Sequence, residues 1–301
     1  MKEQLDGLLT ERVDGRYAHL DTASVAELAD LMNQADADVP GAVRTELPRI
    51  VPAIEGVAGR LAGGGRLLYV GSGTAGRLGV IDASECPPTF GTPPDLVHAV
   101  IAGGPEAILV AKEGVEDDER AGAAAMAEAG VTAADAVVGI SASGRTPYVL
   151  AAVRAARAVG AFTVGLSCNA GTPLSAAAEA PIEVLVGPEV LAGSTRLKAG
   201  TAQKLVLNMI STIAMVRLGK TYGNLMVDLR VTNHKLRDRA VRIIGRVTGA
   251  SRPDAESALD AAGLDVKTAI LLVARPDGDG DPRQRLARTG GRLREALEAT
   301  P

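Results

Sequence analysis

The sequence predicts an α/β protein: a three-layer, doubly wound parallel sheet with N-terminal helices and a small helical module at the C-terminus. Short β-branched runs that end in Gly or Ser alternate with Ala-rich segments of helical pattern. Strands that alternate with helices form parallel sheets covered on both faces. Apolar residues reach 47% of the 301 residues but aromatic residues only 2%, so the core must consist of Ala, Val, Leu and Ile.

Two helices are predicted before the sheet, because residues 24–35 and 43–65 carry apolar side chains at helical spacing. Pro48 and Pro52 mark a start or kink of the second helix, and three glycines end it. The predicted strands are residues 66–71, 97–104, 135–141, 161–167 and 182–187. The predicted helices between them are residues 74–85, 118–129, 147–159 and 173–179.

A long helix over about residues 195–219 is expected after the last strand. Helical patterns then follow at 253–262, 265–274 and 282–299, and the turn ARPDGDGDP separates the last two. The expected domains are an N-terminal helical segment (1–63), a sheet domain (64–249) and a C-terminal helical module (250–301).

Composition and charge exclude several classes of partner. The net charge of −4 does not favour binding to a polyanion, and the chain lacks the rings on which single-stranded nucleic acid stacks. Residues 230–301 hold 14 basic and 10 acidic residues of alternating sign, which is typical of a helical module. The chain has only two cysteines, Cys86 and Cys168, which excludes a disulfide framework and favours a reducing compartment. No apolar segment resembles a signal peptide or membrane span, so we expect a cytoplasmic protein with no membrane or nucleic-acid partner.

Two loops that follow predicted strands carry groups that can hold a phosphate. Residues 71–79 read GSGTAGRLG and open a helix, where Ser72 and Thr74 add hydroxyl donors. Residues 141–146 read SASGRT and also lie between a strand and a helix. Glycines let backbone amides approach an anion, and a helix start supplies free N–H groups. Ordinary caps and turns are the alternative, but two such loops in equivalent places favour a phosphate site.

The first loop also matches the dinucleotide-binding pattern G-x-G-x-x-G, which alone is a weak signal. That fingerprint needs an acidic residue at the end of the second strand to bind the ribose. Here that strand ends in Ala-Gly-Gly-Pro (102–105), and no acid occurs before Glu106. The sequence therefore argues against a dinucleotide site.

Two glutamates form a candidate acid/base pair. Cys86 precedes Pro87, which disfavours helix, so Glu85 is expected in the last helical turn, where the helix dipole raises the pKa of an acid. Glu116 lies close to the helix start predicted at Asp117-Asp118, which favours the ionised form that a base requires. Carboxylates with pKa values pushed apart are typical of such pairs. The alternative for Glu116 is a solvated acidic helix start.

Other candidates are weaker. Lys198 and Lys204 lie on the predicted long helix and are expected to be solvated, with phosphosugar contact as the alternative. His98 and His234 have no partners at metal-ligand spacing, so no metal site is predicted.

Longer motifs resemble one family. The segments are LLYVGSGTAGRLGVIDASECPPTFG (67–91), IAGGPEA (101–107), KEGVEDD (112–118), VVGISASGRTPYV (137–149), EVLAGSTRLKAGTAQKLVLNMIST (189–212) and GKTYGNLMVDLRVTNHKLRDRA (219–240). In this order the chain, from about Thr10 to about Ile244, resembles the N-acetylmuramic acid 6-phosphate etherases of the sugar isomerase (SIS) superfamily.

The resemblance implies an SIS-like fold and a lyase that cleaves the D-lactyl ether of N-acetylmuramic acid 6-phosphate in cell-wall sugar recycling. It implies Glu85 as proton donor to the leaving group and Glu116 as the C2 base. The implied phosphate-binding residues are Ser72, Thr74, Ser141, Ser143 and Thr146. It implies no metal or organic cofactor and a homodimer with sites near the subunit interface.

The chain departs from the family at two places. Ala75 stands where the first loop often has Ser, and the N-terminal T-E-x-R-N motif is reduced to Thr10-Glu11-Arg12-Val13-Asp14. Two alternatives remain open: an aldose–ketose isomerase on the same fold, and a non-enzymatic phosphosugar sensor. The paired glutamates favour the etherase over both.

Overall fold

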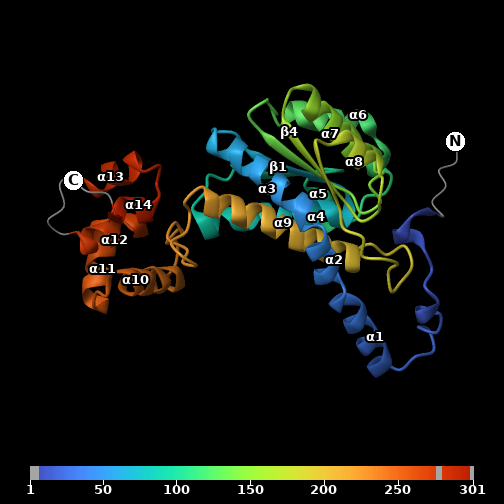
Figure 1. Cartoon of the computed structure of the whole chain (residues 1–301), viewed down its shortest axis with the longest axis horizontal. Helices are drawn as coiled ribbons and strands as arrows, with labels where there is room; N and C mark the ends of the chain where they lie inside the picture. The colour runs from blue at the N-terminus through green and yellow to red at the C-terminus, as the bar shows by residue number, and fades with distance from the viewer. Residues whose placement is uncertain (1–6, 276–279, 299–301) are drawn as a thin grey trace. The chain divides into compact units, whose positions relative to one another are not determined.

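The structure is a computed structural model that describes residues 7–275 and 280–298 (Figure 1). The chain forms two compact units. The sheet unit comprises Met1–Ser84 and Asp95–Ser211, and the C-terminal unit comprises Glu85–Pro94 and Thr212–Pro301. The units do not follow the three-part division expected at 63/64 and 249/250. That division into domains stays a prediction.

Five parallel strands form one sheet in the order β2-β1-β3-β4-β5, which confirms the predicted α/β class. They are β1 (Leu67–Gly71), β2 (Val97–Ile101), β3 (Ala136–Ile140), β4 (Phe162–Ser167) and β5 (Ala180–Glu183). Strands β1 and β3 are buried along their whole length, as expected of central parallel strands.

Two strands differ from the prediction. Strand β5 begins and ends earlier than the predicted 182–187, because β4 ends at Ser167, which pairs with Glu183 and leaves no neighbour for the following residues. Strand β2 ends at Ile101 rather than at 104, since Gly103 and Gly104 take positive φ angles of 84° and 72° and turn the chain away.

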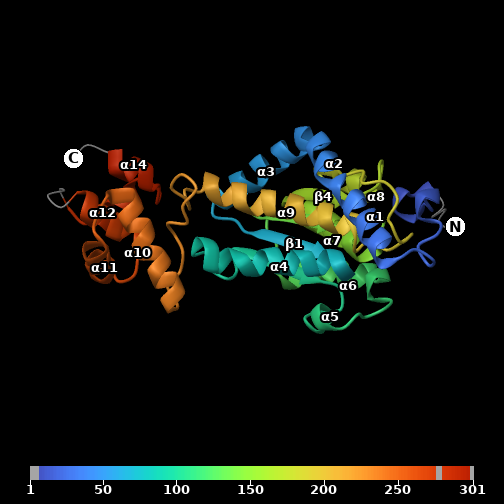
Figure 2. The ribbon, with the colours of Figure 1, turned by 90° about the horizontal axis from the view of Figure 1, so that it is seen from below.

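Helices cover both faces of the sheet, as Figures 1 and 2 show. On one face, α7 (Pro147–Ala158) packs on β3 and β4, beside α6 (Glu119–Glu128) and α8 (Pro173–Ala177). This layer buries an aliphatic cluster that includes Leu68, Val137 and Val153. On the other face, α3 (Leu47–Ala62) packs on β3, β4 and β5, and Gly56 leaves room for the ring of Phe162.

The N-terminal region holds three helices where two were predicted. A capping box between Ser24 and Glu27 starts α1 (Val25–Ala37). Helix α2 (Val39–Thr45) follows, and Pro48 in the first turn of α3 fixes a new helix start. The remaining short elements of the sheet unit are η2 (Leu9–Glu11), η3 (Gly15–Tyr17), α5 (Glu106–Leu109) and η4 (Val115–Asp117).

Two long helices run through both units, α4 (Gly73–Phe90) and α9 (Lys198–Arg217). The C-terminal unit adds α10 (His234–Thr248), α11 (Arg252–Ala261), α12 (Val266–Ala274), α13 (Pro282–Arg288) and α14 (Leu293–Glu298) around one aliphatic core. The sequence pattern did not predict α10. The helix predicted over 282–299 is broken, because Gly290 and Gly291 take positive φ angles.

Residues 276–279 of the turn predicted at 274–282 lie outside the described residues, as does the end of the last predicted helix. A search of the described helices finds none with the length and apolar character that a membrane crossing requires.

Asp135, at the start of β3, is buried and accepts hydrogen bonds from Arg66 (backbone N 2.8 Å, Nη2 2.9 Å) and from the backbone N of Thr132 (2.9 Å). Burial alone would raise the pKa of this carboxyl, but the hydrogen bonds and the Arg66 charge outweigh it and lower the pKa below its ordinary value of 3.8.

We expect Asp135→Asn to lower the free energy of unfolding by about 2–3 kcal/mol at pH 7. Because the folded-state pKa is lowered, this stabilisation is present above about pH 4 and is lost as the pH falls through the folded-state pKa. Urea unfolding at pH 7 and pH 3 measures it, and the deficit should shrink at pH 3. Glu106→Gln, which removes an exposed ion pair with Lys112, is the control with little effect. An equal deficit at both pH values would contradict the explanation.

Candidate active site

The first loop connects β1 to α4. Gly71 and Gly76 pack against each other so closely that an added Cβ on Gly71 would lie 2.7 Å from the backbone N of Gly76. This contact brings the start of α4 onto the end of β1. The hydroxyl groups of Ser72 and Thr74 are half-buried and form no hydrogen bond within the described chain, so both can serve a ligand. Ala75 is buried and offers no polar group.

The second loop connects β3 to α7 and gathers three hydroxyl groups. Ser141 Oγ lies 3.2 Å from Ser143 Oγ and 2.8 Å from Thr146 Oγ1. The backbone N of Gly144 donates to Ser141 Oγ (3.0 Å), which shapes the loop around that oxygen. Pro147 occupies the first turn of α7, so the hydroxyl cluster lies at a helix N-terminus. Such an arrangement suits an anion.

The sheet brings the two loops together. β1 and β3 are neighbours, and Gly71 and Ile140, the last residues of the two strands, are register partners. The loops therefore leave the sheet side by side, at the position between β1 and β3 where the strand order reverses. In open α/β sheets this switch point is the usual ligand crevice. The structure thus assembles the predicted phosphate-binding residues, while their role stays a prediction.

A buried amide supports the second loop from behind. Asn169, after β4, donates through Nδ2 to the carbonyl O of Ala142 (2.9 Å) and to Thr10 Oγ1 (3.1 Å). Its Oδ1 accepts from the backbone N of Leu9 (2.7 Å). Asn169 and Thr10 are 3% and 0% exposed, so these bonds form away from water. The side chain of Asn169 therefore connects the N-terminal segment to the second loop.

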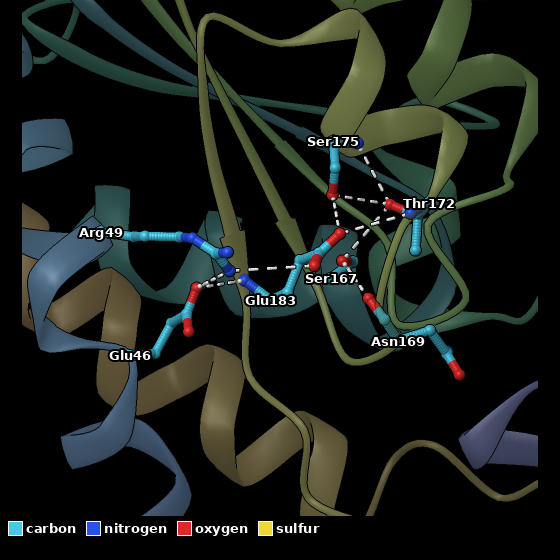
Figure 3. A network of polar contacts seen from close by, with 7 residues as sticks. All are labelled: Glu46, Arg49, Ser167, Asn169, Thr172, Ser175 and Glu183. Atoms are coloured by element: carbon cyan, nitrogen blue, oxygen red, sulfur yellow. Dashed lines mark hydrogen bonds and ion pairs between the residues drawn. The ribbon is translucent and has the colours of Figure 1, made fainter.

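Further polar contacts continue from this point along the carboxyl ends of β4 and β5 (Figure 3). Ser167 Oγ donates to the carbonyl O of Asn169 (3.1 Å), and Thr172 Oγ1 donates to Ser167 Oγ (3.5 Å). Ser175 Oγ donates to Glu183 (2.5 Å), and Thr172 lies within 2.9 Å of Ser175. The backbone N of Glu183 in turn donates to Glu46, which accepts from Arg49. The network fixes the turn on which the second loop packs.

The phosphate that the second loop is predicted to bind does not react, so we expect Thr10→Val to raise KM for a phosphosugar several-fold with a smaller change in kcat. Thr10→Ser keeps the hydroxyl that Asn169 needs and is the matched control. Asn169→Leu removes the side-chain hydrogen bonds to Leu9 N and Ala142 O. It should also lower the free energy of unfolding by about 2 kcal/mol. Steady-state kinetics and urea unfolding measure both, and equal KM values for the two Thr10 variants would contradict the role.

Glu85 is not at a helix end. The prediction that α4 stops before Pro87 is wrong: the helix continues to Phe90, five residues past Glu85, with Pro87 and Pro88 inside it. Cys86 and Phe90 are buried, 2% and 7% exposed, and this apolar burial outweighs the prolines. The helix-dipole argument for Glu85 as the proton donor therefore fails. Glu85 itself is exposed and belongs to the C-terminal unit.

Glu116 lies in the sheet unit, exposed in the single turn η4. Gly114, which precedes this turn, takes a φ of +75°. Asp118 caps α6 by accepting from the backbone N of Ala121 (2.9 Å), which confirms the predicted helix start. Glu116 thus precedes the cap by two residues. The catalytic roles of both glutamates stay predictions.

Asp82, one turn before Glu85, is a buried acid that the sequence reasoning missed. It accepts from Tyr69 Oη (2.8 Å), Asn208 Nδ2 (2.6 Å) and Ser211 Oγ (3.1 Å), and so links β1, α4 and α9. Burial raises the pKa of Asp82. Only its i, i+3 relation to Glu85 could have drawn attention to it in the sequence.

Lys198 is not solvated, contrary to prediction. It is 3% exposed, and its Nζ donates to the carbonyl O of Val186 (2.8 Å). Glu189, also buried, accepts from the backbone N of Lys198 and of Ala199, both at 2.9 Å, and caps the start of α9. Desolvation lowers the pKa of Lys198.

Lys204 is exposed, as expected. Among residues 7–275 and 280–298, no cluster of three or more His, Cys, Asp or Glu could hold a metal.

The fold and the paired loops define an SIS-domain protein. The sequence matches the SIS domain over residues 115–213 and the N-terminal SIS domain of glucokinase regulatory protein over residues 49–157. It also matches the C-terminal lid domain of glucokinase regulatory protein over residues 223–268. Among solved structures, a phosphoheptose isomerase from Neisseria gonorrhoeae superposes with a TM-score of 0.49 at 17% identity, over 64% of this chain and 98% of that one.

Relatives that match the whole chain identify the family more narrowly than the domain matches do. The chain is 55% identical to the N-acetylmuramic acid 6-phosphate etherase of Streptomyces avermitilis, over 100% of this chain and 97% of the relative. It is 57% identical to the enzyme of that name from Rubrobacter xylanophilus, over 99% of this chain and 98% of the relative. The chain belongs to the N-acetylmuramic acid 6-phosphate etherase family, which confirms the resemblance seen in its motifs.

Proposed function

We propose that this protein is an N-acetylmuramic acid 6-phosphate etherase, a carbon–oxygen lyase that releases D-lactate and N-acetylglucosamine 6-phosphate. The observation that carries the proposal is the pair of hydroxyl-rich loops at the β1/β3 switch point, in a chain 55% identical to an etherase along its whole length. The loops supply neutral hydroxyl and amide donors, which suit the phosphate of a small phosphosugar.

In the proposed mechanism, the phosphate binds the first loop through Ser72 and Thr74. In the second loop it binds Ser141, Ser143 and Thr146. The substrate reacts as the open-chain aldehyde, whose carbonyl makes the C2 proton acidic. Glu116 removes that proton, the C3–O bond breaks, and Glu85 protonates the departing lactate oxygen.

Water then adds to C3 of the unsaturated aldehyde, and a proton returns to C2. The ether oxygen therefore leaves with D-lactate, and the oxygen of one water becomes the C3 hydroxyl group of the sugar. The aldehyde itself activates C2, so the proposed reaction needs no metal or organic cofactor. Asp82, Asn169 and Lys198 lie outside this scheme as supports of the framework.

The setting of the reaction follows from its substrate. N-Acetylmuramic acid occurs in bacterial cell walls, so the proposed role is the recycling of cell-wall sugar in the cytoplasm. We also propose that the protein is a homodimer. Size-exclusion chromatography with light scattering tests the dimer, which doubles the chain mass of 30.7 kDa.

The test is incubation of the purified protein with N-acetylmuramic acid 6-phosphate in H₂¹⁸O, followed by a D-lactate assay and mass spectrometry. We expect stoichiometric D-lactate and one ¹⁸O at C3 of the product sugar. A ketose formed without lactate would mean an isomerase instead. Binding without turnover would mean a phosphosugar sensor. Heavy oxygen in lactate rather than in the sugar would exclude the elimination route.

A further inference from the structure

A cavity of about 530 Å³ lies in the C-terminal unit, where three residues of α10 line it. Its basic wall consists of Arg239, Arg242 and Arg246. Its apolar wall consists of Leu225, Met226 and Ile243, and Asn224 adds an amide. Among the described residues, no carboxylate lines it. Its volume falls within the range of small-molecule sites.

The three arginines share one face of α10, because they are spaced i, i+3 and i+7. Like charges at this spacing repel one another and destabilise a helix. Of the three, Arg242 alone has an acidic partner in the described structure, Asp238 at 2.9 Å, which also pairs with Arg252. Within the part of the chain that the structure describes, Arg239 and Arg246 form no ion pair.

Other arginines near this helix are neutralised. Arg237 on the same helix pairs with Asp260 at 2.7 Å, and Arg252 pairs with both Asp238 and Glu256. Arg239 instead contacts the sulfur of Met226 at 3.9 Å, on the cavity wall. Positive charge is therefore concentrated at the cavity, and Asp238 beside Arg242 compensates only part of it.

We propose that this cavity binds a small phosphate ester of phosphosugar size. Guanidinium groups match phosphate oxygens in geometry and charge, and two or three can share one phosphate. The apolar wall then takes the carbon skeleton, and the Asn224 amide bonds a hydroxyl group. The proposal does not rest on the etherase activity, because the cavity residues belong to the C-terminal unit and binding is measured without turnover.

Met226 provides a local reporter. The full-length protein is labelled with ¹³C at the methyl groups of its six methionines, and Met226→Leu identifies the Met226 signal. N-Acetylglucosamine 6-phosphate, inorganic phosphate, D-lactate and N-acetylglucosamine are titrated separately at constant ionic strength. We expect a saturable shift of the Met226 signal with the phosphate ester, a weaker response to inorganic phosphate, and none with the unphosphorylated sugar.

Arg246→Gln should weaken this binding about tenfold, since it removes one charge-assisted contact. Arg237→Gln, which alters an arginine of α10 outside the cavity, is the matched control and should bind normally. Ser143→Ala should impair turnover yet keep the Met226 response, so failure of the etherase proposal and failure of this one are distinguishable.

Three results would overturn the proposal. One is the absence of a saturable shift at about 10 mM phosphate ester. Another is an equal response to D-lactate, which would show an unselective anion effect. The third is unchanged binding by Arg246→Gln. Because Arg246 is exposed and unpaired, that variant should fold normally, which its methionine spectrum verifies in the same experiment.

Discussion

Glu116→Gln is expected to abolish the exchange of the substrate C2 proton with solvent and to lower kcat about 10²–10⁴-fold, the usual contribution of a positioned base. The amide keeps the shape of the side chain but cannot accept the proton. Because Glu116 is exposed in a single turn and caps no helix, the loss should come without a change in stability.

The effect of Glu85→Gln should differ from that of Glu116→Gln in one respect. If Glu85 protonates the leaving lactate, its amide variant still forms the carbanion at C2, so deuterium exchange from D₂O persists while D-lactate release falls about 10²–10⁴-fold. Proton NMR of the substrate in D₂O follows exchange, and a D-lactate assay follows elimination in the same sample.

Glu113→Gln is the matched control, because Glu113 is an exposed glutamate three residues from Glu116. It should keep both exchange and lactate release. Loss of exchange in Glu85→Gln but not in Glu116→Gln would reverse the assigned roles. Full activity of both amide variants would remove the glutamates from the mechanism.

Gly144→Ala should have the largest effect on the framework of the site. Gly144 takes a φ of +67°, and an added Cβ would lie 2.5 Å from Thr172 Oγ1. Thr172 caps α8 through its hydroxyl and cannot easily yield. Backbone strain and overpacking together should lower the free energy of unfolding by about 3–4 kcal/mol. Displacement of the loop hydroxyls should lower kcat/KM about 10²-fold.

Gly171→Ala is its control, because Gly171 has a similar φ of +61° but nothing within 4 Å of an added Cβ. Backbone strain alone should then lower the free energy of unfolding by about 1 kcal/mol, and kcat/KM should stay nearly unchanged. Urea unfolding and steady-state kinetics measure both variants. If the two alanines destabilise equally, the packing against Thr172 does not determine the loop.

The strands and loops were predictable because their signals are local. A β-branched run that ends in glycine specifies a buried strand followed by a turn, and β1, β3 and β4 lie within a residue of their predicted bounds. The serine- and glycine-rich segments also contain their own loop geometry, as the bond from Gly144 N to Ser141 Oγ shows. The same segments carried the family resemblance.

Helix ends and buried charges were not predictable in this way. The prolines after Cys86 predicted the end of the helix. Burial of Cys86 and Phe90 stabilises the helix beyond that point, so α4 continues past both prolines. Lys198 was expected to be solvated, but it is buried. Its Nζ donates to the carbonyl O of Val186, and its backbone N donates to the carboxylate of Glu189. Both outcomes depend on partners that lie elsewhere in the chain.

The sequence by itself determined the fold class, the two hydroxyl- and glycine-rich loops and the family, because each depends on neighbouring residues or on motifs in order. Only the tertiary structure decided that the loops leave paired residues, Gly71 and Ile140, and that Asn169 joins one of them to Thr10 across 159 positions. It also concentrated three arginines at one cavity of the basic C-terminal region. The physical reason is that burial, pairing and charge compensation are set by neighbours in space, which residue order alone does not specify.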